Sequence, residues 1–205
     1  LKEAFPNEQI KVAIAHDSRN NAKLYTRITA EVFSANDILV YLFKELRPTP
    51  ILSFAIRTLQ CHGGVVLTAS HNPKEYNGYK AYWNDGAQLI APHDDQVIKN
   101  VKSIQSIDEV KFDKKSALIK YLDDTIDRQY LDMIASLSLS SPQKNKASNL
   151  NIVFSPIHGT GITLVPSALD KFGFENVTVV SEQAQPNGDF PTVIYPNPEE
   201  AEALE

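Results

Sequence analysis

Ser70 stands among side chains that can hold a phosphate. Hydrogen-bond donors and cations follow it closely along the chain: His71, Asn72, Lys74 and Lys80. A phosphorylated serine carries roughly −1.5 to −2 charges and three acceptor oxygens, which suit such neighbours. The pattern therefore favours a phosphate carried on the Ser70 hydroxyl.

Ser70 has two other interpretations. By position alone, a serine that merely shapes a turn or caps a helix is the commoner case. Only the polar and cationic residues that surround Ser70 argue against this interpretation. A hydrolase nucleophile is disfavoured because the Gly-x-Ser-x-Gly elbow is not present. His71 is the adjacent residue, and neighbours in an extended loop point apart rather than pair as base and nucleophile.

Buried strands are expected to position these groups. Ser70 directly follows an apolar, β-branched run at residues 65–69, and a similar run at 10–15 leads into a polar turn that contains Arg19. Ligands bind at the carboxyl ends of strands in α/β sheets. Arg19 is therefore a candidate to face the same cleft as Ser70, with a surface turn as its alternative.

The remaining pattern predicts a layered α/β fold. Further strands are expected at residues 38–43 and 79–83, the latter in a hairpin with 88–90, and helices at 21–35, 94–104 and 125–137. Another helix is expected with Thr49 as its N-cap and Pro50 first, closed by Gly63-Gly64. This alternation predicts a mixed, mostly parallel sheet flanked by helices.

A polar, serine-rich segment at residues 138–149 is the expected linker. It separates a first domain (1–137) from a second α/β domain (150–205). In the second domain we expect strands at 151–154 and 177–180, a glycine-rich turn after His158, a helix at 163–172 and a helix start at Asn197. A sheet with so few strands and helices around it is poorly buried, and we therefore expect this domain to be cut short.

The amino-acid composition limits the classes of function that the chain can have. Hydrophobic residues make up 42% and charged residues 22%, as in ordinary globular proteins. The net charge is −5 without long blocks of one sign, which argues against nucleic acid or membrane surfaces as partners. One cysteine allows no internal disulfide, and no apolar run is long enough for a membrane span. A cytoplasmic protein is the plain expectation.

Several motifs resemble those of the α-D-phosphohexomutase superfamily, the phosphoglucomutases and phosphomannomutases. Thr68-Ala69-Ser70-His71-Asn72-Pro73 with Tyr76-Asn77-Gly78-Tyr79-Lys80 is similar to its phosphoserine loop. Further similar stretches are Ala15-His16-Asp17-Ser18-Arg19, Pro48-Thr49-Pro50, Ser155-Pro156-Ile157-His158-Gly159-Thr160-Gly161, and the segments 190–191 and 196–200. The resemblance covers most of the chain.

The resemblance implies an isomerase of carbohydrate metabolism that interconverts hexose 1-phosphate and hexose 6-phosphate. Its phosphoserine, here Ser70, gives its phosphate to the sugar, the bisphosphorylated sugar reorients, and the other phosphate returns. Mg²⁺ is the implied cofactor, bound through the phosphate on Ser70, with hexose bisphosphate as activator. Lys80 is implied in proton transfer or charge stabilisation.

Other implied site residues carry alternatives. His71 either contacts the phosphate or shapes the loop, and Asn72 is a candidate phosphate ligand with Arg19. The turn at His158 resembles a phosphate cradle at a helix start, but its glycines also permit a tight strand-to-helix connection, and this structural role is slightly favoured.

The resemblance is also incomplete. The family's aspartate-rich metal loop, its sugar-recognition loop and its C-terminal domain have no counterpart in the sequence. We therefore expect an N-terminal piece that is inactive without the missing domains of the same protein. A noncatalytic phosphosugar-binding or regulatory module is the alternative, and a phosphatase is a third. The preferred sugar, whether glucose, mannose or a pentose, is not determined by these residues.

Overall fold

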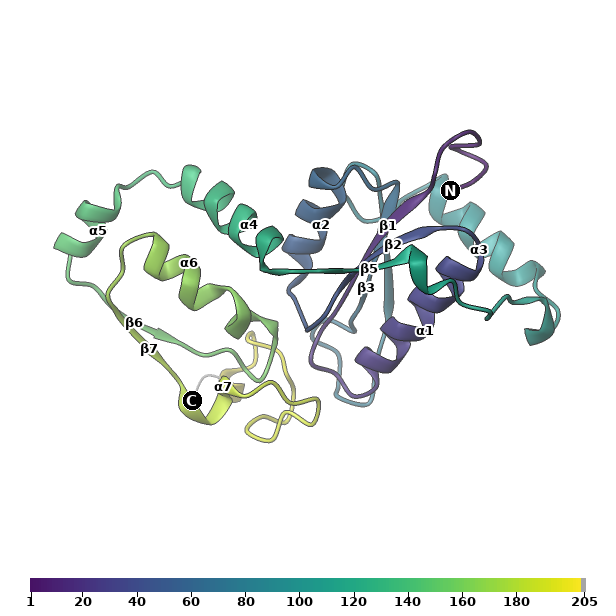
Figure 1. The fold of residues 1–205 in the computed structure, drawn as a ribbon. Helices are drawn as coiled ribbons and strands as arrows, with labels where there is room; N and C mark the ends of the chain where they lie inside the picture. Colours follow the sequence, from purple (N-terminus) through teal and green to yellow (C-terminus); the bar gives the residue numbers. More distant parts are fainter. Residues whose placement is uncertain (204–205) are drawn as a thin grey trace.

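A five-stranded sheet forms the centre of the first unit. The computed structural model describes residues 1–203 and arranges them as two α/β units (Figure 1). The strands are β1 (Lys11–His16), β2 (Leu39–Phe43), β3 (Gly63–Leu67), β4 (Tyr79–Trp83) and β5 (Ile119–Leu122). Their order is β4-β3-β1-β2-β5, and β4 alone runs antiparallel to its neighbour. This confirms the predicted mixed, mostly parallel sheet.

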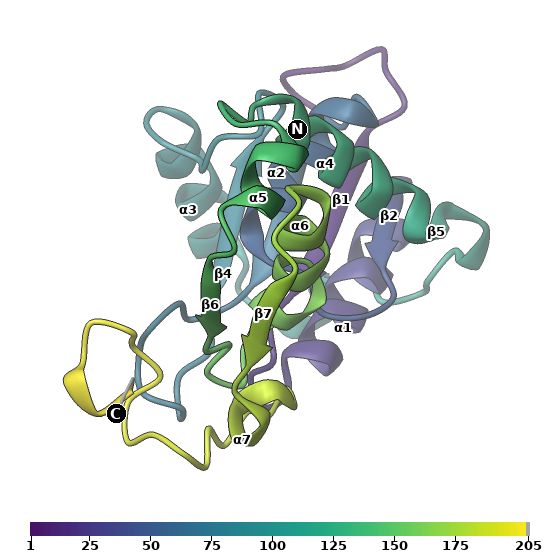
Figure 2. The same cartoon turned by 90° about the vertical axis from the view of Figure 1, so that its left-hand side faces the viewer.

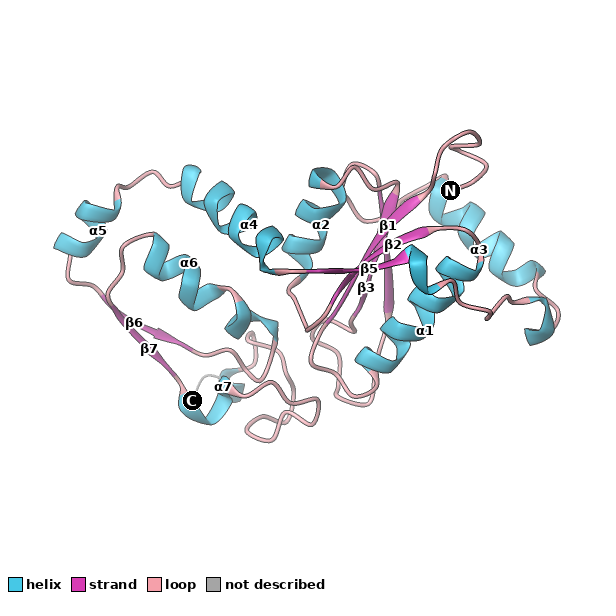
Figure 3. Ribbon diagram, viewed as in Figure 1, coloured by secondary structure: helices cyan, strands magenta, loops and turns pink. Residues whose placement is uncertain are grey.

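Helices cover both faces of this sheet (Figure 3). They are α1 (Ala22–Ala35), α2 (Thr49–Thr58), α3 (His93–Ser103) and α4 (Asp124–Ser136), with 3₁₀ turns at Ile107–Glu109 and Ser116–Leu118. Strand β1 is buried on both faces, with Ala13 and Ala15 in the core beneath α2 and Val12 and Ile14 in the opposite core. Burial on both faces explains the continuous apolar run from which the strand was predicted.

The second unit holds two parallel strands, β6 (Asn151–Phe154) and β7 (Asn176–Val179), which lie side by side (Figure 2). Around them are α5 (Pro142–Ala147), a 3₁₀ turn (Thr160–Thr163), α6 (Val165–Lys171), α7 (Ser181–Ala184) and a 3₁₀ turn (Ala201–Ala203). No helix among residues 1–203 combines the length and the apolar character needed to cross a bilayer.

The glycine pair was assigned the wrong role. Gly63 and Gly64 begin β3 rather than close α2, which ends at Thr58. A Cβ on Gly64 would lie 2.6 Å from the Cδ1 of Ile56, so the strand needs glycine where α2 packs against it.

Other differences lie at exposed edges and at helix starts. Strand β5 was not predicted, residues 88–90 give only one bridge from Gln88 to Tyr82, and the expected linker contains α5. Pro48, not Thr49, is the N-cap of α2. The helix start expected at Asn197 gives only the 3₁₀ turn at Ala201–Ala203, and residues 204–205 of the expected second domain lie outside the described residues.

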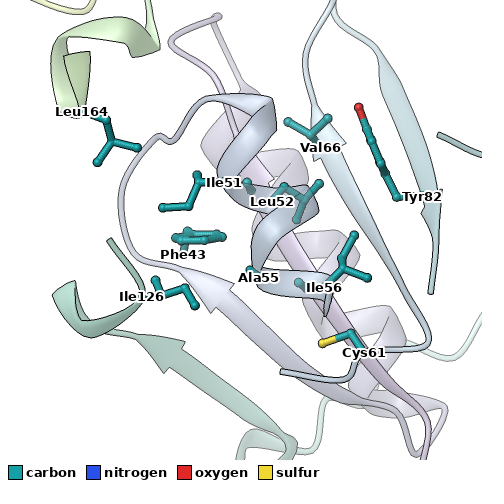
Figure 4. Close-up of a cluster of buried hydrophobic side chains, with 12 residues drawn as sticks. Phe43, Ile51, Leu52, Ala55, Ile56, Cys61, Val66, Tyr82, Ile126 and Leu164 are labelled. Carbon is teal, nitrogen blue, oxygen red and sulfur yellow. The ribbon is translucent and has the colours of Figure 1, made fainter. Parts of the chain in front are cut away.

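One side chain of the second unit is part of the core of the first. Leu164 is only 5% exposed and belongs to the same buried cluster as Phe43, Ile51 and Ile126 (Figure 4). Leu164 lies just before α6, so this contact holds the start of α6 against the first unit, where the helix packs on α4. Burial of a leucine side chain contributes on the order of 1.5–3 kcal/mol, so this contact is a substantial tie between the units.

Leu164→Ala is expected to destabilise the chain by about 2–5 kcal/mol because it removes buried methyl groups and leaves a cavity. Leu139→Ala is the matched control, since Leu139 is fully exposed, and should change stability by less than about 0.5 kcal/mol. Urea unfolding followed by circular dichroism measures both variants. Equal midpoints would show that Leu164 does not tie the units together.

Candidate active site

Ser70 lies in a loop that connects two neighbouring strands at the carboxyl edge of the sheet. We call residues 68–78 the serine loop; it is closed by a hydrogen bond from the Thr68 N–H to the Gly78 carbonyl at 3.0 Å. Ser70 is exposed and has a left-handed backbone, with φ of 57°. Its N–H donates to the Thr68 Oγ1 at 2.9 Å. The strained turn thus presents the serine side chain to solvent.

A cleft of about 370 Å³ lies between the two units, and Ser70 lines it. His71 and Lys80 line it from the first unit, while the segments 154–157 and 159–161 and Phe190 line it from the second. Lys80 stands on β4 opposite Val66, on the same face as the buried Tyr82. The structure therefore brings Ser70, His71 and Lys80 together at one cleft.

Asn72 is exposed on the serine loop and is not one of the residues that line the cleft. Its N–H donates to the Ala69 carbonyl at 3.1 Å, and its own carbonyl accepts from Arg19 at 2.5 Å. In this structure the backbone of Asn72 shapes the loop, and phosphate binding by its side chain stays a prediction.

Arg19 does not face the cleft. Its side chain is only 1% exposed and lies beneath the serine loop, where it donates to four backbone carbonyls. Its Nε lies 3.5 Å from the Oδ2 of Asp17. The expected direct contact with a phosphate is therefore not what the structure shows, because the guanidinium is occupied by the protein's own backbone.

His158 is also turned inward. It is 2% exposed, its Nδ1 lies 2.9 Å from the Gln185 carbonyl, and its Nε2 lies 3.0 Å from the Thr192 Oγ1. Both ring nitrogens therefore have partners within the second unit. The geometry matches the tight structural connection that the sequence left open as the alternative.

The turn around His158 does not leave its amides free for an anion. Gln183 accepts from the Ile157 N–H through its side chain at 3.2 Å and from the His158 N–H through its carbonyl at 3.0 Å. The Gly159 N–H donates to the Pro156 carbonyl at 2.9 Å. A phosphate cradle needs convergent amides without partners, so these three cannot form one in this conformation.

Asp17, Ser18, Thr49 and Thr68 also line the cleft and were not selected as site residues. Burial raises the pKa of the Asp17 carboxyl, although a hydrogen bond with Thr68 and the nearby Arg19 act in the opposite direction. Asp17 could have been predicted as a cleft residue, because it directly follows β1. Strand β1 pairs in parallel with β3, the strand before Ser70, so both strands end at the same edge of the sheet.

The described residues do not fit a complete magnesium site. Asp17 and Ser70 offer oxygen atoms at the cleft, but no three His, Cys, Asp or Glu side chains within residues 1–203 are grouped to hold a metal. Mg²⁺ prefers six oxygen ligands in octahedral geometry, and usually keeps several waters. Further protein ligands would have to come from outside the described residues.

The class of protein follows from comparing these two α/β units, with an exposed serine at the cleft between them, with known families. The family model "Phosphoglucomutase/phosphomannomutase, alpha/beta/alpha domain I" matches residues 1–108, and the model for domain II of the same family matches residues 128–205. The chain belongs to the phosphoglucomutase/phosphomannomutase family.

Named relatives agree with this assignment. A phosphoglucomutase of Staphylococcus haemolyticus is 34% identical over 209 residues, which is 100% of this chain and 37% of that protein. Human phosphopentomutase is 34% identical over 198 residues, 94% of this chain and 32% of that protein. The chain thus spans about a third of the length of these relatives.

A solved structure shows the same fold. A phosphoglucomutase/phosphomannomutase family protein of Burkholderia thailandensis superposes with a TM-score of 0.74 at 20% identity, over 100% of this chain and 42% of that one. The similarity extends through both units and confirms the α/β architecture.

A matched pair of histidines tests the site geometry. His158→Ala should lower stability by about 1–3 kcal/mol, because it leaves the Gln185 carbonyl and the Thr192 hydroxyl without their partner. His71→Ala should change stability by less than about 0.5 kcal/mol, because His71 is exposed. Thermal and urea unfolding of the two variants make the comparison, and equal effects would contradict the structural role of His158.

Proposed function

We propose that this chain is part of a phosphohexomutase that interconverts hexose 1-phosphate and hexose 6-phosphate through a phosphate on Ser70. One observation carries the proposal: the exposed Ser70 sits in a left-handed loop at a cleft shared with His71 and Lys80. Membership of the phosphoglucomutase/phosphomannomutase family supports it. The cleft is of the size expected for a small phosphorylated ligand.

The proposed cycle has two phosphoryl transfers. In the first, a sugar hydroxyl attacks the phosphorus and the P–Oγ bond of phosphorylated Ser70 breaks. The hydroxyl loses its proton to a phosphate oxygen or to water, and the released serine oxygen gains one, so that no net proton is consumed. Lys80 can supply that proton or stabilise the developing charge from its position in the cleft. The bisphosphorylated sugar then reorients, and its other phosphate returns to Ser70 by the reverse step.

The rest of the proposed site lies elsewhere in the whole protein. Sugar recognition and the protein ligands of Mg²⁺, which would also bind the phosphate on Ser70, are proposed to come from outside this chain, which alone would be inactive or nearly so. Residues 1–137 and 150–205 are proposed as the two domains, although the second family model already begins at residue 128, within α4. A cytoplasmic location is proposed with this metabolic role.

Ser70→Ala in the full-length protein should abolish conversion of hexose 1-phosphate to hexose 6-phosphate. The phosphate carrier is removed, so a loss of at least about 10⁴-fold in kcat is expected. The assay couples the product to a hexose 6-phosphate dehydrogenase, with Mg²⁺ and a trace of hexose bisphosphate. Ser103→Ala is the control, because Ser103 is exposed at the end of α3.

Three results would count against this proposal. Equal activity in Ser70→Ala and the parent protein would assign the chemistry to another residue. No activity in the parent with glucose, mannose and pentose phosphates would favour a phosphosugar-binding module. Release of inorganic phosphate without an isomeric sugar phosphate would indicate a phosphatase.

Lys80→Met should slow phosphoryl transfer by about 10²–10⁴-fold, because it keeps the apolar stem and removes the ammonium group. Lys74→Met is the matched control: Lys74 is an exposed lysine of the adjoining serine loop and is not one of the residues that line the cleft. Single-turnover transfer from radiolabelled phosphoserine protein to a hexose phosphate measures the step. Equal rates for the two variants would remove Lys80 from the mechanism.

A further inference from the structure

The serine loop is held from below by a single buried cation. The Nη1 of Arg19 donates to the carbonyls of Pro73 and Tyr76, both at 2.9 Å, and its Nη2 donates to those of Ser70 and Asn72, at 3.0 and 2.5 Å. We propose that Arg19 is the positioning residue of the serine loop: it sets where the Ser70 hydroxyl stands in the cleft. This inference rests on the proposed function of Ser70.

The four carbonyls come from most of the length of the loop. Two other hydrogen bonds hold the ends of the loop, from the Thr68 N–H to the Gly78 carbonyl and from the Asn77 Nδ2 to the Asn20 carbonyl. The bonds within it are local, such as the one from the Tyr76 N–H to the Pro73 carbonyl at 3.0 Å. Ser70, His71 and Asn72 are exposed, so burial of their side chains does not fix the backbone. A convergence of four carbonyl dipoles is unfavourable without a cation between them, and this makes Arg19 the main constraint on the conformation of the loop.

The shape of the guanidinium matters as much as its charge. Its planar fork sends hydrogen bonds from two nitrogens to four acceptors at once, whereas a lysine ammonium offers three donors from one point. Asp17 lies 3.5 Å from the Nε and offsets the positive charge locally. Arg19 therefore acts on Ser70 through the geometry of the backbone.

The second unit covers this cation. The ring of Phe190 has its centroid 5.5 Å from the Arg19 Cζ, and the ring is almost fully buried. The side chain of Asn20, the next residue, donates through its Nδ2 to the Asp189 carboxylate at 2.8 Å. The backbone carbonyl of Asn20 accepts from the Asn77 Nδ2 at 3.1 Å. The two Asn20 bonds are exposed, whereas the Phe190 ring excludes water from the buried guanidinium and so strengthens its hydrogen bonds.

The deciding variant is Arg19→Lys in the full-length protein, because it keeps the charge and removes the fork. Amide hydrogen exchange of peptides from the serine loop should rise at least about tenfold, with β1 peptides unchanged. The value of kcat should fall about 10–100-fold with KM within about twofold, because the phosphoserine is displaced rather than the sugar site. Phe190→Leu, which keeps Arg19 but thins its cover, should raise loop exchange by a smaller factor.

Arg47→Lys is the matched control. Arg47 is a largely buried arginine that donates to Asp127 and does not contact the serine loop. It should leave loop exchange and kcat as in the parent, whatever its effect on stability. An equal loss of kcat in Arg47→Lys would reduce the Arg19 effect to general destabilisation and overturn the proposal.

Other outcomes also decide the question. Parent-like loop exchange in Arg19→Lys, exchange that rises equally in β1, or a change confined to KM would each overturn the positioning role. If the parent shows no mutase activity, the proposed function fails, while the exchange of the loop still supports or overturns the role of Arg19. The two hypotheses therefore fail separately.

Discussion

The parallel pairing of β1 with β3 is the constraint on which the cleft depends. His16 lies opposite Leu67 in the register, and the Asp17 N–H donates to the Leu67 carbonyl at 3.1 Å. Two strands that run the same way and end together place the turn after β1 under the loop after β3. Because of this register, Arg19 reaches a loop that follows it by about fifty residues. A one-residue slip would turn the side chains of β1 to the opposite faces.

Three residues with strained backbones line the cleft where this pairing meets the second unit. Ser70, Ile157 and Phe190 line the cleft with positive φ, at 57°, 46° and 47°, although none of them is glycine. Each such residue costs on the order of 1–3 kcal/mol and persists only where surrounding contacts impose it. The contacts here are the carbonyl bonds of Arg19 and the side chain and backbone of Gln183. The buried polar groups thus hold the conformations that shape the cleft.

The sequence predicted what depends on local patterns. Strand β1 and helix α1 were predicted to within one residue and β3 to within two, because they are buried in apolar or helical repeats. The half-exposed edge strand β5 lacks such a repeat and was missed. The inward roles of Arg19 and His158 were not predictable because their partners lie 51–57 and 27–34 residues away along the chain. The sequence left a structural role open for His158 and a surface turn for Arg19, and only the hydrogen-bond partners show that both side chains are turned inward.

The two walls of the cleft differ in the kinds of residue that they contain. The first unit contributes the side chains suited to chemistry, Ser70, His71 and Lys80, while the second contributes largely backbone and apolar surface, including Ile157 and Phe190. Phosphoryl transfer benefits from a site that excludes water, because fixed dipoles then act at full strength. A wall without ionisable groups provides this exclusion and adds no competing base. The second unit therefore supplies the opposite wall of the cleft, and one residue of that wall, Phe190, also covers Arg19 beneath the serine loop.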